Sequence, residues 1–158
     1  MKITKIKNGK SIKISYEEGL DKKTLTSKEE AVSEYYDAFS CLALDIKTNL
    51  ASQVGHRGKD AEDFIRRQML RIEAIAFTYK GGETYPYTYE IWGDHEIGGT
   101  VWYTPIHLQF DFGSEWSPDK SALRILEEAT KYINNHRAQM NLFEKPEELK
   151  DWKVTKVE

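Results

Sequence analysis

The chain has 158 residues, of which 39% are hydrophobic and 31% are charged, with 10 glycines and 4 prolines. This length and this proportion of hydrophobic to charged residues fit one domain with a substantial hydrophobic core. They exclude a low-complexity, collagen-like or wholly disordered chain. The 23 basic and 26 acidic residues leave a net charge of −3, which argues against a protein that coats duplex nucleic acid through its overall charge.

The single cysteine, Cys41, excludes an internal disulfide and a zinc site built from cysteines, and it fits a reducing compartment. The first seven residues alternate charged and apolar side chains without a signal-peptide core. No apolar run approaches the length that spans a membrane. We therefore expect a soluble, cytoplasmic protein.

The N-terminal segment predicts a β-hairpin. Apolar residues alternate with polar ones from Lys2 to Tyr16, on both sides of Asn8-Gly9, a dipeptide typical of tight turns. Residues 1–28 carry eight lysines against three acidic residues, so the remainder of the chain is acidic. The charge is therefore polarised along the sequence.

A helix is predicted after this hairpin. Ser27 and Glu30 match a capping box, and apolar residues recur every three or four positions from Val32 to Leu50. The polar stretch from 51 to 58 contains two glycines and no periodicity, which predicts an exposed loop.

Three strands are predicted after residue 69, over 70–79, 85–91 and 102–112, with glycine pairs in the turns between them. Consecutive strands with short connections form an antiparallel meander, one face of which can stay in contact with solvent. Pro86 and Pro105 indicate edge or bulge positions, because proline cannot donate to a strand ladder.

A second helix is predicted to begin at Ser117-Pro118-Asp119, where a capping hydroxyl, a proline and a carboxylate occur in the favoured order. Asn134 and Asn135 are expected to end it. The pattern predicts an α+β fold in which an N-terminal hairpin and a three-stranded meander form a mostly antiparallel sheet, with two helices packed on one face. We expect one domain over 1–138 and a C-terminal tail over 139–158.

The tail begins with a short peptide that suggests a partner. Gln139, Met140, Asn141, Leu142 and Phe143 resemble the bacterial sliding-clamp-binding peptide, whose pattern is glutamine, a leucine-like residue, a small or acidic residue, leucine and phenylalanine. In that family the glutamine amide bonds at the rim of the clamp pocket, and the leucine-phenylalanine pair fills it. The resemblance implies docking on a sliding clamp. The alternative is that the apolar residues of this peptide pack on the chain's own core.

A second resemblance covers the stretch from Glu127 to Phe143. Its Tyr132-Ile133-Asn134, Arg137-Ala138-Gln139 and Leu142-Phe143 are similar to the ending of a family of small uncharacterised phage and prophage proteins. Members commonly lie among early replication and recombination genes, so the resemblance implies a context in mobile-element DNA metabolism. It brings no catalytic residues with it.

Other polar groups are weaker candidates. Asp94-His95-Glu96, near a predicted turn, joins an imidazole to two carboxylates as a metal or acid–base site requires, although polar residues at a hairpin tip are more often simply solvated. His56 and Arg57 lie between glycines but lack the spacing of a phosphate-binding loop. Cys41 lacks a matched histidine and is more consistent with a small core residue than with a nucleophile.

The solvent face of the predicted meander is a further candidate. Tyr103, His107 and Gln109 share it by strand parity and could line a ligand groove, although an ordinary solvated face is the simpler interpretation. Aromatic residues of these strands could also hold single-stranded nucleic acid by stacking. A basic rim would come from Arg71, the nearby arginines 66 and 67, and the lysines of the N-terminal hairpin.

These observations favour a non-enzymatic accessory protein of a phage or other mobile element, without a cofactor or metal, which docks on the bacterial sliding clamp through residues 139–143. The alternative is a domain that binds a ligand or single-stranded nucleic acid on its sheet face, for example to counter host defence, through Arg71, Tyr103, His107 and Gln109. An enzyme built on Asp94, His95, Glu96 or His107 has no assembled motif to support it.

Overall fold

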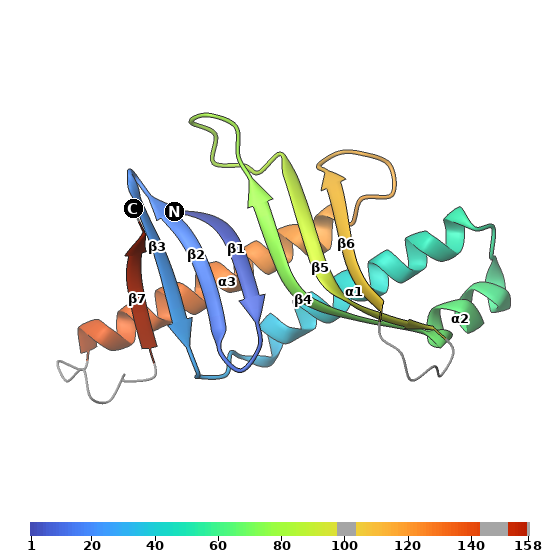
Figure 1. Ribbon diagram of the computed structural model, residues 1–158, viewed down its shortest axis with the longest axis horizontal. Helices are drawn as coiled ribbons and strands as arrows, with labels where there is room; N and C mark the ends of the chain where they lie inside the picture. The colour runs from blue at the N-terminus through green and yellow to red at the C-terminus, as the bar shows by residue number, and fades with distance from the viewer. Residues whose placement is uncertain (98–103, 143–151, 158) are drawn as a thin grey trace.

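The computed structural model describes residues 1–97, 104–142 and 152–157, with side chains described for 1–96 and 104–137. Within these residues the chain forms seven strands and three helices (Figure 1). In chain order they are β1 (Lys2–Asn8), β2 (Ile12–Glu18), β3 (Asp21–Ser27), α1 (Ser33–Gln53), α2 (Gly58–Arg67), β4 (Gln68–Thr78), β5 (Thr88–Ile97), β6 (Thr104–Asp111), α3 (Asp119–Leu142) and β7 (Trp152–Val157).

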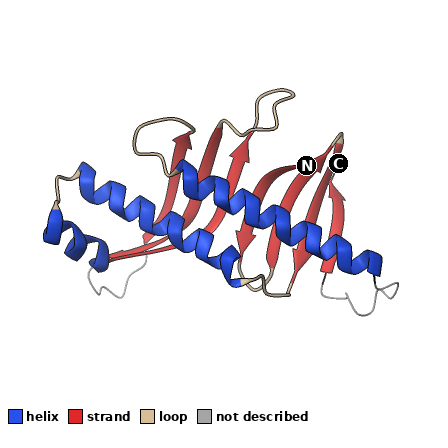
Figure 2. Cartoon of the chain, turned by 180° about the vertical axis from the view of Figure 1, so that it is seen from behind, coloured by secondary structure: helices blue, strands red, loops and turns tan. Residues whose placement is uncertain are grey.

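All seven strands belong to one antiparallel sheet with the order β6-β5-β4-β1-β2-β3-β7. It consists of two sets of consecutive strands, β1-β2-β3 and β4-β5-β6, which meet along a ladder of three residue pairs between β1 and β4. Helices α1 and α3 both lie across one face (Figure 2), whereas none of the described helices covers the opposite face (Figure 1). The predicted α+β class is confirmed, although the set of elements differs in detail.

The core lies between the sheet and these two helices. On β2, Ile12, Ile14 and Tyr16 are buried because every second side chain of a strand points to the same face. Tyr35 and Leu42 on α1 recur at helical spacing and belong to the same buried cluster. The alternation of apolar and polar residues that predicted the hairpin therefore also determines which face of the sheet is apolar, and the helices cover that face.

Two predictions at the start of α1 are wrong. Ser27 is the last residue of β3, where its Oγ accepts a hydrogen bond from the Glu29 amide at 3.0 Å, and it does not cap a helix. Helix α1 begins at Ser33, and Val32 precedes it without a side-chain cap. The polar sequence of β3, with Leu25 and Ser27 as its buried residues, hides a strand that pairs with β2 along its whole length.

The predicted loop over 51–58 is also wrong in part. Helix α1 continues to Gln53, and α2 begins at Gly58. None of the α2 residues is fully buried. Its apolar residues Ala61, Phe64 and Ile65 are half-buried at helical spacing, and this short stripe was not recognised in the sequence.

The C-terminal part of the chain departs most from expectation. Helix α3 begins at Asp119 as predicted, but it runs through Asn134 and Asn135 to Leu142. Both asparagines are exposed, whereas Ile133 and His136 are buried, so packing of the helix overrides the weak helix propensity of asparagine. The predicted boundary at 138/139 falls inside α3. Residues 152–157, expected as tail, form β7 and pair with β3.

Candidate binding site on the uncovered face of the sheet

Exposed lysines share the uncovered face on β1, β2 and β3. Ile6 and Ile14 are fully buried beneath the helices, so the residues next to them in each strand point to the opposite face. The exposed lysines found there are Lys5 and Lys7 on β1, Lys13 on β2 and Lys22 on β3.

The register of the hairpin places Lys7 directly opposite Lys13. Like charges at directly opposed positions of an antiparallel pair destabilise it, because their Cβ atoms are only about 4.5–5.5 Å apart. On the other side of β1, Lys7 faces Ala74, which brings no charge. Among the described side chains no carboxylate forms an ion pair with either lysine. An anion bound between the two ammonium groups would offset their mutual repulsion.

One glutamate interrupts the basic surface. Glu17 lies opposite Lys2 on one side and opposite Lys22 on the other. We call this surface the basic half-face; it consists of Lys2, Lys5, Lys7, Lys13, Lys22 and Glu17. Five lysines and one glutamate give it a formal charge of +4.

The other half of the uncovered face is acidic. Arg71 is its one arginine, and its guanidinium donates to Asp94 Oδ2 at 2.7 Å and lies 3.4 Å from Glu73 Oε1. The hydrogen bond from Arg71 holds the pKa of Asp94 below its usual range. The acidic half-face consists of Glu73, Glu90, Asp94, Glu96, Asp111 and Arg71, with a formal charge of −4. The uncovered face is therefore strongly polarised across the strands.

Trp92 stands near the boundary between the two halves. The His107 ring stacks on it with centroids 4.8 Å apart and planes 8° from parallel. The ammonium of Lys5 lies 5.0 Å from the centre of the indole ring. Both contacts engage the indole ring, and Trp92 is only half-exposed, so it is less open to a stacked base than a fully exposed aromatic residue.

Exposed tyrosines adjoin the basic half-face instead. Tyr85 and Tyr87, in the connection between β4 and β5, are 55% and 42% exposed. The Lys80 ammonium lies 4.4 Å from the centre of the Tyr87 ring. Lys2 Nζ, at the end of the basic half-face, lies 3.5 Å from the carbonyl oxygen of Gly81 in the same connection. The Tyr85 ring also packs against Phe112 with centroids 5.5 Å apart. This tyrosine loop, residues 80–87, thus combines partly exposed aromatic rings with cations.

Three of the four residues predicted for the sheet face lie together on it. Arg71, His107 and Gln109 are exposed there, and each has protein partners. Arg71 binds Asp94, His107 Nε2 lies 3.7 Å from Glu90 Oε1, and Gln109 donates to the same Glu90 oxygen. Tyr103 lies outside the described residues.

Sequence reasoning singled out the lysine-rich hairpin only as a rim. The closeness of Lys7 and Lys13 depends on register, since a two-residue turn at Asn8-Gly9 would have set Lys7 opposite Lys10 instead. The structure pairs Asn8 with Ile12 across a longer turn. The sequence does contain a hint of this pairing. Lys7 and Lys13 each lie three residues from Lys10, so a turn centred on Lys10 places them opposite each other.

Comparison of the chain with protein-family models, curated proteins and solved structures finds no match.

The Asp94-His95-Glu96 segment does not form one site. It lies inside β5 and not at a turn, so Asp94 points to the uncovered face and His95 to the helix face, where its Nε2 lies 2.5 Å from Gln68 Oε1. No cluster of three metal-ligating side chains occurs within the described part of the chain.

The remaining candidate side chains are engaged in packing. Cys41 on α1 is half-buried, and its Sγ accepts a hydrogen bond from Arg124 Nη1 at 3.3 Å. His56 packs against Phe64 of α2 with ring centroids 4.7 Å apart. Arg57 is exposed and immediately precedes α2.

The clamp-like peptide is not a separate tail at its start. Gln139, Met140, Asn141 and Leu142 form the last turn of α3, which extends past β7 at the left edge of Figure 1. Phe143 lies outside the described residues. None of the described helices has the length and apolar character needed to span a membrane.

Proposed function

We propose that this chain is a binding protein that holds single-stranded nucleic acid against the basic half-face and the tyrosine loop. The observation that carries the proposal is the cross-strand pair of Lys7 and Lys13. Two opposed ammonium groups cost the free protein stability, and a phosphate group lying over the hairpin would turn that repulsion into attraction.

The tyrosine loop supports a single strand over a duplex. Bases of a single strand are free to stack on aromatic side chains, whereas duplex bases are already stacked on one another. Tyr85 and Tyr87 expose their rings beside Lys80. The acidic half-face repels phosphates and confines the footprint to β1, β2 and β3, so a net acidic chain can still attract a polyanion locally.

The test is a titration of labelled single-stranded oligonucleotide, followed by fluorescence anisotropy at 50 and 200 mM NaCl. Lys7→Gln/Lys13→Gln should weaken binding and flatten its salt dependence, because each lost phosphate contact removes about 0.7 from the logarithmic slope. The matched control is Lys59→Gln/Lys120→Gln, which removes two exposed lysines from α2 and α3. Equal losses in both variants, or binding that does not respond to salt, would contradict the proposal.

A second candidate function is docking on the bacterial sliding clamp through residues 139–143. Support comes from the position of this peptide in the last turn of α3, beyond the edge of the sheet (Figure 1). Docking as an extended peptide would require this turn to unwind, and helix ends open at lower cost than helix interiors. Together with the resemblance to phage proteins, both candidates describe a non-enzymatic accessory protein of mobile-element DNA replication or recombination.

The clamp proposal is tested by titrating purified sliding clamp with wild type and with Leu142→Ala/Phe143→Ala. Loss of micromolar binding in the variant supports docking, since a short peptide forms a small, transient interface. Equal binding by both proteins removes this candidate and leaves the nucleic-acid proposal untouched.

A further inference from the structure

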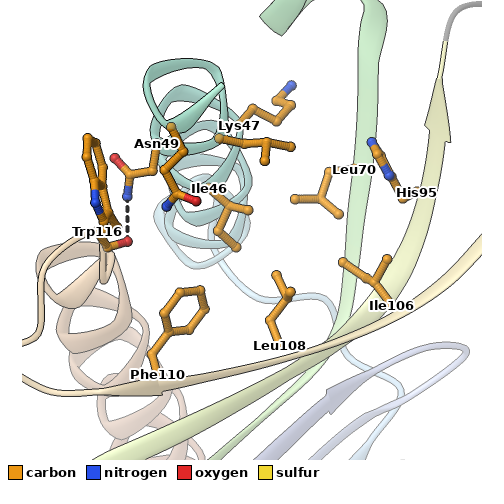
Figure 3. A pocket seen from close by; sticks show the side chains of 11 residues that line it. Ile46, Lys47, Asn49, Leu70, His95, Ile106, Leu108, Phe110 and Trp116 are labelled. Atoms are coloured by element: carbon orange, nitrogen blue, oxygen red, sulfur yellow. Dashed lines mark hydrogen bonds between the residues drawn. The ribbon is translucent and has the colours of Figure 1, made fainter. Parts of the chain in front are cut away.

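A cavity of about 230 Å³ lies on the helix face of the sheet, between α1 and the three strands β4, β5 and β6 (Figure 3). Its wall is mainly apolar. Ile46 and Leu50 on α1 face Leu70 on β4 and Ile106, Leu108 and Phe110 on β6. Because β6 is the edge strand of the sheet as described, the cavity lies beside the edge of the sheet and not beneath its middle.

One region of the wall is polar and organised around Gln68, which is 5% exposed. Lys47 Nζ lies 3.4 Å from the Gln68 carbonyl oxygen, and the His95 ring lies 2.5 Å from the Gln68 side-chain oxygen. These contacts hold Lys47 and His95 at the cavity wall (Figure 3).

Lys47 is the one permanently charged side chain among the described residues that line the cavity. It is half-buried, and no carboxylate of the described residues lies within ion-pair distance of it. The Lys47 ammonium is partly desolvated and donates to the Gln68 carbonyl oxygen, so it retains further donors for an anion. A charge-assisted hydrogen bond to such an anion is stronger than a neutral one.

The rim of the cavity holds a strained residue. Trp116 has a φ of 67°, in the left-handed region that residues other than glycine rarely occupy. Its carbonyl oxygen accepts a hydrogen bond of 2.8 Å from Asn49 Nδ2, which fixes this conformation at the rim (Figure 3). Backbone strain of this kind persists where the surroundings enforce it, and it concentrates at ligand sites.

The geometry points to a binding site for a small hydrophobic carboxylic acid. The apolar body of the ligand lies on Leu70, Leu108 and Phe110, and its carboxylate pairs with Lys47. This function is separate from nucleic-acid binding, because the cavity lies on the face of the sheet opposite to the basic half-face.

The test is isothermal titration at neutral pH with hexanoate, octanoate and decanoate, and with octylamine as the charge-reversed probe. Affinity should rise about fourfold for each added methylene group until the cavity is full, which is the gain expected for burying one CH₂. Octanoate should bind more tightly than octylamine. Equal binding of octanoate and octylamine, or no binding of any acid, overturns the proposal.

Two variants locate the site. Lys47→Met keeps the apolar stem and removes the charge, so octanoate affinity should fall about tenfold, the scale of a charge-assisted hydrogen bond. Lys59→Met, on the exposed surface of α2, is the matched control and should bind as wild type does. Leu108→Phe fills the cavity and should abolish binding. If that variant does not fold, Lys47→Met decides alone: unchanged octanoate affinity contradicts the proposal.

Discussion

Replacing Lys7 by glutamate should stabilise the fold and weaken binding of single-stranded nucleic acid at the same time. The substitution turns the opposed pair of like charges at Lys7 and Lys13 into a pair of opposite charges. Each cross-strand charge term is worth roughly 0.2–1 kcal/mol, so removing the repulsion and adding an attraction should raise the free energy of unfolding by about 1 kcal/mol. For a chain of this size the melting temperature should rise by about 2–4 °C.

The effect on binding follows from the number of exposed lysines. If Lys5, Lys7, Lys13 and Lys22 each contact a phosphate, the logarithmic dependence of affinity on salt has a slope of about −2.8, and going from 50 to 200 mM NaCl weakens binding about 50-fold. Lys7→Glu removes one positive charge and adds one negative charge. We therefore expect a slope of about −1.4 and a loss of about sevenfold over the same range.

Thermal unfolding and fluorescence anisotropy measured on the same protein samples check both halves of this prediction. Lys13→Glu should behave as Lys7→Glu does, because the two positions are equivalent in the pair. The double variant restores a like-charge pair, so it should lose the gain in stability and still bind weakly. A Lys7→Glu protein that melts below wild type, or that binds with the wild-type salt slope, would refute the reasoning.

Three further predictions concern other parts of the molecule. Tyr85→Ala/Tyr87→Ala should weaken single-strand binding by about 1–3 kcal/mol per stacked base without changing the salt slope, whereas Tyr36→Ala, at a similarly exposed tyrosine of α1, should not; anisotropy titration distinguishes them. Burial lowers the pKa of His136 to about 4 from its ordinary 6.5. Because the unfolded chain protonates this ring near pH 6.5 and the folded chain does so only near pH 4, the free energy of unfolding should be at its full value above pH 6.5 and fall by about 1.4 kcal/mol per pH unit toward pH 4. Urea unfolding measured across this range should show this decline in wild type and a smaller decline in His136→Gln. An added Cβ at Gly93 would clash with the Arg71 carbonyl oxygen, so Gly93→Ala should cost about 3 kcal/mol in urea unfolding, while Gly9→Ala, which meets no atom within 4 Å, should change stability by less than about 0.5 kcal/mol.

The sequence predicted those elements that begin or turn at a strong local signal, such as a turn dipeptide or a helix-start motif. The alternation on both sides of Asn8-Gly9 gave a hairpin, and Ser117-Pro118-Asp119 marked the start of α3. At that start, the Asp119 carboxylate accepts hydrogen bonds from the Gly113 amide at 2.7 Å and the Tyr89 hydroxyl at 3.0 Å. These tertiary contacts reinforce a boundary that the sequence already favoured.

Elements that depend on their neighbours were missed. Strand β3 is mostly polar and forms because β2 and β7 flank it with complementary ladders. Helix α2 has no buried residue, and the extension of α3 past Asn135 depends on packing at Ile133 and His136. For β3 and for the end of α3, contacts from distant parts of the chain override weak local preference, whereas α2 carries a short amphipathic pattern of its own that was overlooked.

The candidate site was predicted in its composition but not in its geometry. The surplus of lysine in residues 1–28 was visible, and it becomes the basic half-face because β1, β2 and β3 are adjacent. The Lys7–Lys13 pair was not predictable from a two-residue turn, since the observed register sets Ile6 opposite Ile14 and buries both. Burial of this apolar pair decides the register, and the register creates the charge pair.

The most direct measurement of the central claim is amide chemical-shift mapping of the full chain during titration with a short single-stranded oligonucleotide. Binding to the basic half-face should shift amides of β1, β2 and β3 and of residues 80–87, and adding salt should reverse these shifts. Shifts confined to β5 and β6, or none at concentrations that saturate the anisotropy signal, would contradict the account.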